Sequence, residues 1–225
     1  MQISPTTNLI TRIDYGSHDY PSRLHDLYDP PASLYIYGDI KLLKIPMIAI
    51  VGSRSASLEG LRIARLFAQA LSKKGVIVLS GLAKGIDSAA HQATIELGPK
   101  HPTAAVLGTG VDVVYPRQNV ALSKAITRQG LLISEFPLGT GPKAFHFPRR
   151  NRIIAALALG VVVVEAAEKS GSLITARLAA DLGREVFALP GPIHCPNSAG
   201  CHRLIQQGAK LVFRPEDVLE ELLFG

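Results

Sequence analysis

The chain has 225 residues, and 47% of them are hydrophobic, which provides enough apolar side chains for the buried core of one large domain. Its formal net charge of +6 at pH 7 favours an anionic partner, and its composition excludes an intrinsically disordered protein. No apolar run reaches the ~20 residues that a membrane helix requires. The N-terminus lacks a basic region followed by an apolar core, so we expect a cytoplasmic protein that does not engage a membrane.

Residues 1–45 differ in composition from the rest of the chain. Tyr20-Pro21 and Asp29-Pro30-Pro31 are typical of turns, and Leu34 to Tyr37 has the composition of a short strand. We expect a lead-in segment over residues 1–45, packed on a main domain over residues 46–225.

From residue 46 onward, short apolar segments alternate with segments of helical spacing. The expected strands are 47–51, 76–79, 103–107, 131–134, 161–165, 185–189 and an edge strand at 210–213. The expected helices are 58–74, 88–97, 119–129, 153–159, 173–182 and one that starts at Leu204. This alternation indicates an α/β fold with a doubly wound parallel sheet, which binds ligands at the carboxyl ends of its strands.

Gly52-Ser53-Arg54 follows the first core strand. It offers a glycine for close approach, backbone N–H groups at a helix start and one guanidinium, a combination that suits a phosphate. It matches neither of the glycine-rich motifs that bind NAD or ATP, so we expect no cofactor. A tight turn with a surface arginine is an equally good interpretation.

Asp87 and His91 lie four residues apart, on one face of an expected helix. They could form an acid/base pair, but no nucleophile or set of metal ligands accompanies them. We therefore favour a structural interpretation, in which Asp87 complements the helix dipole and is hydrogen-bonded to His91, and we expect no catalytic residue.

Residues 141–152 combine cations with aromatic rings just before an apolar run. The cations are Lys143, Arg149, Arg150 and Arg152, and the rings are Phe145 and Phe147. If residues 153–159 form a helix, the arginines lie at its positive N-terminus, which is unfavourable unless an anion is present. Cations beside exposed rings suit single-stranded nucleic acid, and Asn151 would contact a base edge or fix the loop. The alternative is a solvated basic turn with both rings in the core.

Ser170-Gly171-Ser172 precedes another expected helix. Ser170 or Ser172 could simply cap that helix, whereas the glycine between them could open a nest of N–H groups for an anion. Both interpretations stay open, and in the second Thr175 adds a further donor.

Two cysteines each adjoin a histidine, in His194-Cys195 and Cys201-His202. Each histidine directly adjoins a cysteine, and neither pair shows the C-x2-C or H-x3-H spacing that typifies zinc sites. We therefore expect two reduced thiols and no metal.

These motifs, taken in order, resemble the DprA/Smf family (DNA-processing protein A, natural transformation). The resemblance spans about residues 20–213. It is carried by Gly52-Ser53-Arg54, Ser80-Gly81-Leu82-Ala83, Gly85-Ile86-Asp87, Ala90-His91, Tyr115-Pro116, Ser134-Glu135, Pro137, Phe147-Pro148, Arg150-Asn151-Arg152-Ile153-Ile154, Ser170-Gly171-Ser172-Leu173-Ile174-Thr175-Ala176 and Pro190-Gly191.

The resemblance implies an extended Rossmann-like, mostly parallel sheet that binds single-stranded DNA and loads a RecA-type recombinase onto incoming DNA during natural transformation. It also implies a homodimer, for which an apolar tail offers weak support: Val212, Phe213, Val218, Leu222, Leu223 and Phe224. Many members carry an N-terminal helical domain or a C-terminal winged-helix-like domain, and we expect neither in these 225 residues.

On the DNA-binding interpretation, the contact residues are Ser53, Arg54, Lys143, Phe145, Phe147, Arg149, Arg150, Asn151, Arg152, Ser170, Gly171, Ser172 and Thr175. The alternative is an enzyme that resembles the nucleotide phosphoribohydrolases of related fold. Those enzymes use two glutamates, whose places here are taken by Asn151 and by Arg177 or Leu178. Without these carboxylates general acid/base catalysis lacks its groups, so we expect a binding protein and not an enzyme.

Overall fold

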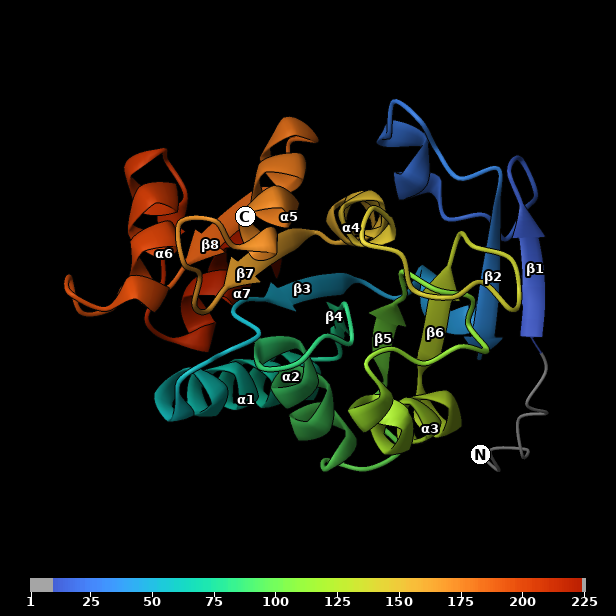
Figure 1. Ribbon diagram of the computed structural model, residues 1–225, viewed down its shortest axis with the longest axis horizontal. Coiled ribbons are helices and arrows are strands. Elements are labelled where there is room, and N and C mark those ends of the chain that lie inside the picture. Colours follow the sequence, from blue (N-terminus) through green and yellow to red (C-terminus); the bar gives the residue numbers. More distant parts are fainter. Residues whose placement is uncertain (1–9, 224–225) are drawn as a thin grey trace.

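The computed structural model describes residues 10–223, which form one nine-stranded sheet with helices on both faces (Figure 1). The strand order is β1-β2-β6-β5-β4-β3-β7-β8-β9. Neighbours from β6 to β9 pair in parallel, whereas β2 pairs antiparallel with both β1 and β6. The predicted fold class, a doubly wound and mostly parallel α/β sheet, is confirmed.

The strands are β1 (Ile10–Asp14), β2 (Ser33–Gly38), β3 (Met47–Val51), β4 (Ile77–Ser80), β5 (Thr103–Val106), β6 (Leu131–Ser134), β7 (Gly160–Val163), β8 (Glu185–Ala188) and β9 (Lys210–Leu211). The α-helices are α1 (Leu58–Lys73), α2 (Ile86–Ile95), α3 (Val120–Gln129), α4 (His146–Leu157), α5 (Gly171–Asp181), α6 (Pro196–Gln206) and α7 (Pro215–Leu223). Three 3-10 helices join them: η1 (Ser22–Asp26), η2 (Ile40–Lys44) and η3 (Arg117–Asn119). Within the described residues no helix is both long and apolar enough to cross a membrane.

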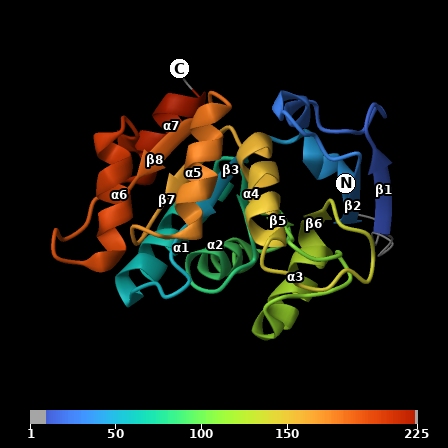
Figure 2. The same cartoon turned by 45° about the horizontal axis from the view of Figure 1, so that its top comes forward.

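The helices divide into two layers, one on each face of the sheet. From β3 to β6 successive strands are added on one side of β3, and from β7 to β9 they are added on its other side. Helices α1, α2 and α3 lie on one face, and α4, α5 and α6 lie on the other (Figure 2). Side chains alternate between the faces along β3, where Ala49 joins the core beneath α4 and Ile48 and Ile50 join the core beneath α1. Both faces of the central strands are therefore buried, as the continuous apolar runs predict.

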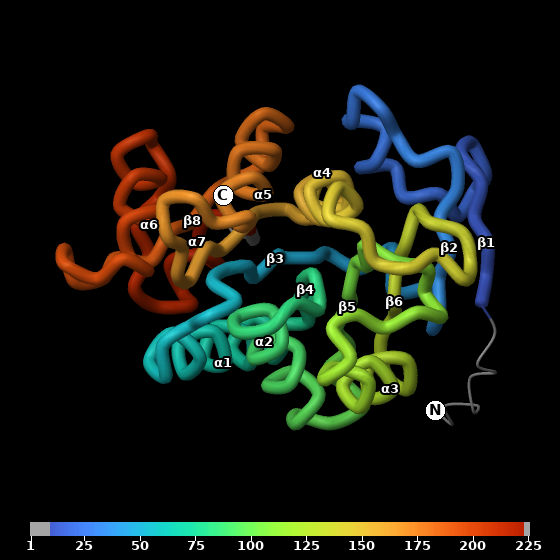
Figure 3. The backbone as a smooth tube through the Cα atoms, viewed as in Figure 1, coloured from blue at the N-terminus to red at the C-terminus, as the bar shows by residue number. Residues whose placement is uncertain are grey.

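Residues 10–45 extend the same sheet instead of forming a separate body (Figure 3). They contribute β1, which the sequence did not predict, and β2, while η1 contacts α4 on the outer face. The Tyr20 hydroxyl, which is buried here, donates to the Pro31 carbonyl at 2.8 Å and closes the lead-in segment on itself. The boundary at residue 45 stays a prediction, and residues 1–9 and 224–225 of the two proposed segments lie outside the described residues.

Helix α4 begins at His146, so the expectation that it begins at Ile153 is wrong. Pro148 lies in the first turn of α4. A backbone N–H in that turn has no partner within the helix, so a proline there removes no helical hydrogen bond. The arginines therefore lie within the helix. Successive helical residues point about 100° apart, so Arg149, Arg150 and Arg152 face different surroundings. Helix α6 also begins earlier than expected, at Pro196, and α7 was not predicted.

Candidate nucleic-acid interface

The strand order reverses at β3, which has β4 on one side and β7 on the other. A doubly wound sheet leaves a crevice at the carboxyl ends of such a pair, because the next helices leave toward opposite faces. A cavity of about 490 Å³ opens at this point. Nine of the predicted DNA-contact residues line it: Ser53, Arg54, Phe147, Arg150, Asn151, Ser170, Gly171, Ser172 and Thr175.

Arg54 and Phe147 meet at the mouth of this cavity. The exposed Arg54 places its guanidinium carbon 5.9 Å from the centre of the Phe147 ring, within the range of a cation–π contact. A Cβ added at Gly108 would lie 2.9 Å from a carbon of that ring, so a larger residue there would displace Phe147. Ser53 holds the turn, since its Oγ accepts from the Ser55 N–H at 3.1 Å. A cation and a partly exposed ring are therefore presented together.

The N-terminus of α5 forms another wall of the cavity. Ser170 caps the helix: its Oγ accepts from the Ser172 N–H at 3.3 Å and lies 2.7 Å from the Ser172 Oγ. The capping interpretation is confirmed, while the role of these groups as an anion nest stays a prediction. Gly171 is exposed at the helix start and Thr175 is buried one turn further on. A helix N-terminus carries partial positive charge, so this wall favours an anion.

Arg150 lines the cavity but is only 4% exposed, and its Nε and Nη1 donate to acceptors within the protein. Its Nη1 donates to the carbonyls of Gly81, at 2.6 Å, and of Val106. A Cβ added at Gly81 would lie 2.5 Å from the guanidinium, so only glycine leaves room for this contact. The Arg150 Nε donates to the Asn151 Oδ1 at 3.1 Å, and the Asn151 Nδ2 donates to the Gly171 carbonyl at 3.3 Å. These residues tie α4 to β4, β5 and α5, so Asn151 does fix the local structure.

Asp87 is the buried acid beside Arg150. Its Oδ2 accepts from the N–H groups of Gly81 at 3.1 Å and Ala83 at 3.3 Å. Burial raises the pKa of Asp87, although the Arg150 charge and these hydrogen bonds oppose that shift. Burial also lowers the pKa of Arg150 to about 10, which leaves it charged at neutral pH.

His91 does not pair with Asp87, so that detail of the prediction is wrong. Its Nδ1 lies 2.8 Å from the Thr103 Oγ1. That hydroxyl donates to the Val78 carbonyl, so it accepts from His91. The Nε2 is buried without a hydrogen-bond partner. Burial lowers the pKa of His91 to about 3, and the ring is a neutral core residue at physiological pH.

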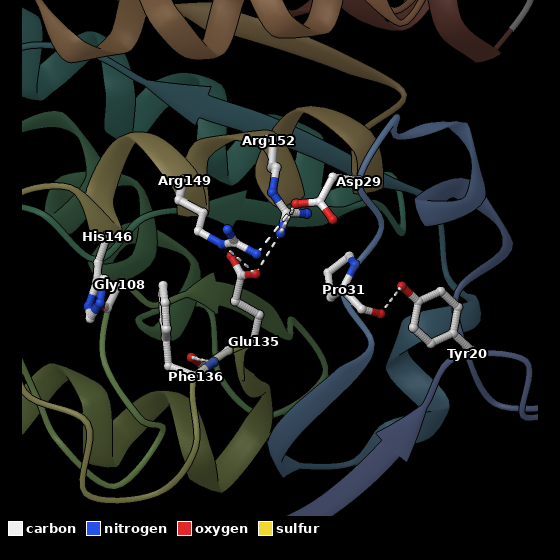
Figure 4. A network of polar contacts seen from close by, with 10 residues as sticks. Tyr20, Asp29, Pro31, Gly108, Glu135, Phe136, His146, Arg149 and Arg152 are labelled. Atoms are coloured by element: carbon white, nitrogen blue, oxygen red, sulfur yellow. Dashed lines mark hydrogen bonds and ion pairs between the residues drawn. The ribbon is translucent and has the colours of Figure 1, made fainter.

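Arg149 and Arg152 lie outside the cavity. They form ion pairs with acidic side chains between α4 and the lead-in segment (Figure 4). The Glu135 Oε2 accepts from the Arg149 Nε at 3.0 Å and from the Arg152 Nη2 at 2.5 Å. Asp29 lies 3.4 Å from Arg149 and 4.0 Å from Arg152. Two acids thus balance two cations, which weakens the attraction of this cluster for phosphate.

Lys143 and Phe145 lie just before α4 and are both exposed. The Lys143 Nζ is 5.9 Å from the centre of the Phe145 ring, which is 66% exposed. The alternative in which both phenylalanines enter the core is therefore wrong for Phe145. Neither residue lines the cavity.

Lys169 and Asn197 also line the cavity, and neither belongs to the predicted set of DNA-contact residues. Lys169 directly precedes the Ser170-Gly171-Ser172 motif, so its place in the sequence is a signal from which it could have been predicted as a further cation of the site. Asn197 reaches the site from α6 and donates to the Ser55 carbonyl at 3.1 Å, a contact between distant parts of the sequence that no local pattern reveals.

The two cysteines lie apart from this chemistry. Cys201 is buried, which raises the pKa of its thiol to about 12, and Cys195 is partly buried. Across residues 10–223 no cluster of three or more His, Cys, Asp or Glu side chains is arranged to hold a metal ion.

A sequence model of the family described as DNA recombination-mediator protein A matches residues 11–223. The chain belongs to this family. Protein Smf of Escherichia coli K12 is 50% identical over 214 residues, which cover 95% of this chain and 57% of Smf. DNA processing protein DprA of Streptococcus pneumoniae is 51% identical over 205 residues, covering 91% of this chain and 72% of DprA. The predicted resemblance to the DprA/Smf family is confirmed.

Solved structures of this recombination-mediator family agree with the fold. The X-ray structure of S. pneumoniae DprA has a TM-score of 0.91 at 46% identity. The match covers 96% of this chain and 75% of the DprA chain. DprA of Helicobacter pylori, described for its unique single-stranded DNA binding mode, has a TM-score of 0.86 at 31% identity and covers 96% of both chains. A molybdenum cofactor binding protein of Rippkaea orientalis, at 18% identity and a TM-score of 0.57, shares the fold alone.

Proposed function

We propose that this chain binds single-stranded DNA in the cavity between β3, α4 and α5. The proposal rests on one observation: the Arg54 guanidinium, the Phe147 ring and the N-terminus of α5 meet in one crevice. Cations and helix N-termini bind phosphates, and accessible rings stack on unpaired bases. H. pylori DprA, whose single-stranded DNA binding mode has been described, shares the fold over 96% of this chain and supports the proposal.

Each wall of the cavity takes one part of the strand. Arg54 and Lys169 contact phosphates as charged donors. Phe147 stacks on one base. Ser170, Gly171, Ser172 and Thr175 surround a second phosphate at the start of α5, and Ser53 keeps the Arg54 turn in place.

Arg150 and Asn151 act beneath this surface. Their hydrogen bonds to Gly81, Val106 and Gly171 engage the Arg150 Nη1 and the Asn151 Nδ2 within the protein. We therefore assign them a positioning role in place of the predicted direct contact with DNA. Lys143 and Phe145 extend the surface beyond the cavity, and Arg149 and Arg152 add little because Glu135 and Asp29 balance their charge.

The chain binds the strand without cleaving it. Among the described residues that line the cavity, Asp87 is the one acid, and it is buried and held by backbone N–H groups. This acid is the observation that favours the alternative, a nucleotide phosphoribohydrolase. A single acid in that setting lacks the partner that general acid/base catalysis needs. Incubation with AMP should release no adenine above the no-protein control, and release that Asp87→Asn abolishes would support the hydrolase instead.

In the cell, the chain would protect incoming DNA and load a RecA-type recombinase onto it during natural transformation, in the cytoplasm. The family description as a recombination mediator supports this role. The chain spans 57% of the length of Smf, so the roles of the complete relatives are carried over here as proposals.

A homodimer is the proposed assembly, but the apolar tail supports it less than the sequence suggests. Val212 and Val218 are fully buried in the core, and Phe224 lies outside the described residues. Leu222 packs against the same core, so Phe213, 71% exposed, is the exposed apolar contact of the predicted tail, and Leu211 of the edge strand β9, 45% exposed, lies close to it in sequence. Light scattering should give twice the chain mass at micromolar concentrations, and Phe213→Glu should shift the species toward the monomer.

A titration with labelled oligothymidine tests the function directly. The fluorescence anisotropy should rise to saturation, and thymidine monophosphate should compete only at far higher concentration because it engages one subsite. A mononucleotide that competes as well as the oligonucleotide would favour a nucleotide enzyme over a strand-binding protein.

A further inference from the structure

A second aromatic side chain contacts Phe147 from outside the set of cavity-lining residues, and the proposed function does not use it. Tyr115 lies in the segment between β5 and η3, and it is 47% exposed. Its ring centre is 5.4 Å from that of Phe147, with 42° between the planes. Arg54 approaches the same Phe147 ring at 5.9 Å. Two rings and a guanidinium therefore form one continuous surface.

The backbone around Tyr115 is fixed by buried contacts. Asn119 is 6% exposed, and its Nδ2 donates to the Leu82 carbonyl at 2.8 Å and to the Ser88 Oγ at 2.9 Å. The Asn119 N–H donates to the Pro116 carbonyl at 3.0 Å. These bonds tie the turn after Tyr115 to the start of α2. An exposed ring on a fixed backbone loses little conformational entropy when a ligand packs against it.

Structural packing alone accounts for only part of this arrangement. The contact with Phe147 uses part of the Tyr115 ring, yet nearly half of the side chain faces solvent. An aromatic ring of this kind beside a cationic groove is the arrangement that proteins use to stack unpaired bases.

We propose that Tyr115 is a second base-stacking subsite, which takes an unpaired base adjacent to the one on Phe147. This inference rests on the proposed function. The two ring planes are inclined by 42°, whereas neighbouring bases in a duplex stack with nearly parallel planes. Bases that stack on both rings are therefore not stacked on each other, an arrangement that a duplex cannot supply without melting.

Substitution at Tyr115 tests the subsite. Tyr115→Ala should weaken the binding of labelled oligothymidine by about 5- to 100-fold, as expected for one lost stacking contact, while Tyr115→Phe should stay within about twofold of the original chain. Tyr15→Ala is the matched control, because Tyr15 is 53% exposed and packs against a ring of its own, Tyr20. A folded Tyr115→Ala chain that binds like the original would overturn the inference.

The sequence contains no tryptophan, which allows a direct optical test. Tyr115→Trp would carry the single indole of the chain, and a base stacked on it should quench its emission when oligothymidine saturates the protein. Tyr15→Trp should show no such change. If anisotropy shows binding without quenching at position 115, the subsite is wrong and the proposed function stands. If the original chain does not bind the oligonucleotide, both are wrong.

Discussion

Two arginines line the same cavity and differ in what they do there. Arg54 is exposed at the mouth, whereas Arg150 is 4% exposed and bonded to carbonyls. The difference follows from where each arginine lies in the fold. Arg54 lies in the loop after β3, whereas Arg150 lies on the inner side of α4. Arg54 is thus the residue whose loss should affect binding without affecting the fold.

Arg54→Ala should weaken single-stranded DNA binding by about 1–3 kcal/mol, the range of a charge-assisted hydrogen bond to phosphate. Its midpoint of urea unfolding should stay unchanged, because the side chain is exposed. Arg62→Ala, which removes an exposed arginine of α1, is the control for net charge. Equal losses in both variants would show that only the overall charge matters.

His91 should make the fold sensitive to acid. Its pKa is about 3 in the folded chain and 6.5 ordinarily, so the unfolded chain binds a proton that the folded chain does not. The free energy of unfolding should therefore fall as the pH drops from 6.5 toward 3, by up to about 1.4 kcal/mol per pH unit.

His91→Gln isolates this contribution, because Asp87 and the other acids remain in both chains. The stability advantage of the original chain over the variant should shrink by about 1.5–2 kcal/mol between pH 6.5 and pH 5, as measured by urea unfolding. An advantage that stays constant over this interval would mean that His91 is protonated in the fold.

At the scale of elements, α4 connects the cavity to the lead-in segment. One side of the helix supplies Arg150 and Asn151 to the cavity, and Arg149 and Arg152 meet Glu135 and Asp29 elsewhere (Figure 4). The two acids differ in burial: the Glu135 side chain is 6% exposed and that of Asp29 is 64% exposed. Glu135 should therefore account for most of the stability of this cluster.

Glu135→Gln should lower the free energy of unfolding by about 3 kcal/mol, because Arg152 would then be largely buried without its acid. Asp29→Asn should lower it by less than about 1 kcal/mol, as is usual for an exposed pair. Urea unfolding of both variants at neutral pH provides the comparison. Similar losses would indicate that Asp29 and Glu135 are equally important to the docking of the lead-in segment.

The sequence predicted those elements whose signals are local. The strands 47–51 and 131–134 have the predicted bounds, because their apolar residues are continuous and bounded by turn residues. The start of α4 was missed because Pro148 and the nearby charges resemble a loop. The setting of Arg150 was also missed, since its partners Gly81 and Val106 are distant in sequence. Burial of a charged side chain in such contacts leaves no periodic signal.

At the scale of the whole molecule, the reversal of strand order at β3 determines where the site lies. Loops from β3 and β7, together with α4, meet there even though they are far apart in the sequence. The net charge of +6 adds a general attraction for nucleic acid, which salt screens. Only the stacking surface distinguishes unpaired bases from paired ones, so selectivity for single strands reports on the site itself.

The most direct test is the affinity for labelled oligothymidine compared with a blunt duplex of the same length, in the same moderate salt. We predict tighter binding of the single strand, and Phe147→Ala should reduce that preference because it removes a ring on which bases stack. Affinities for both should fall as salt rises, since phosphate contacts release counterions. Equal affinity for the single strand and the duplex would contradict the account.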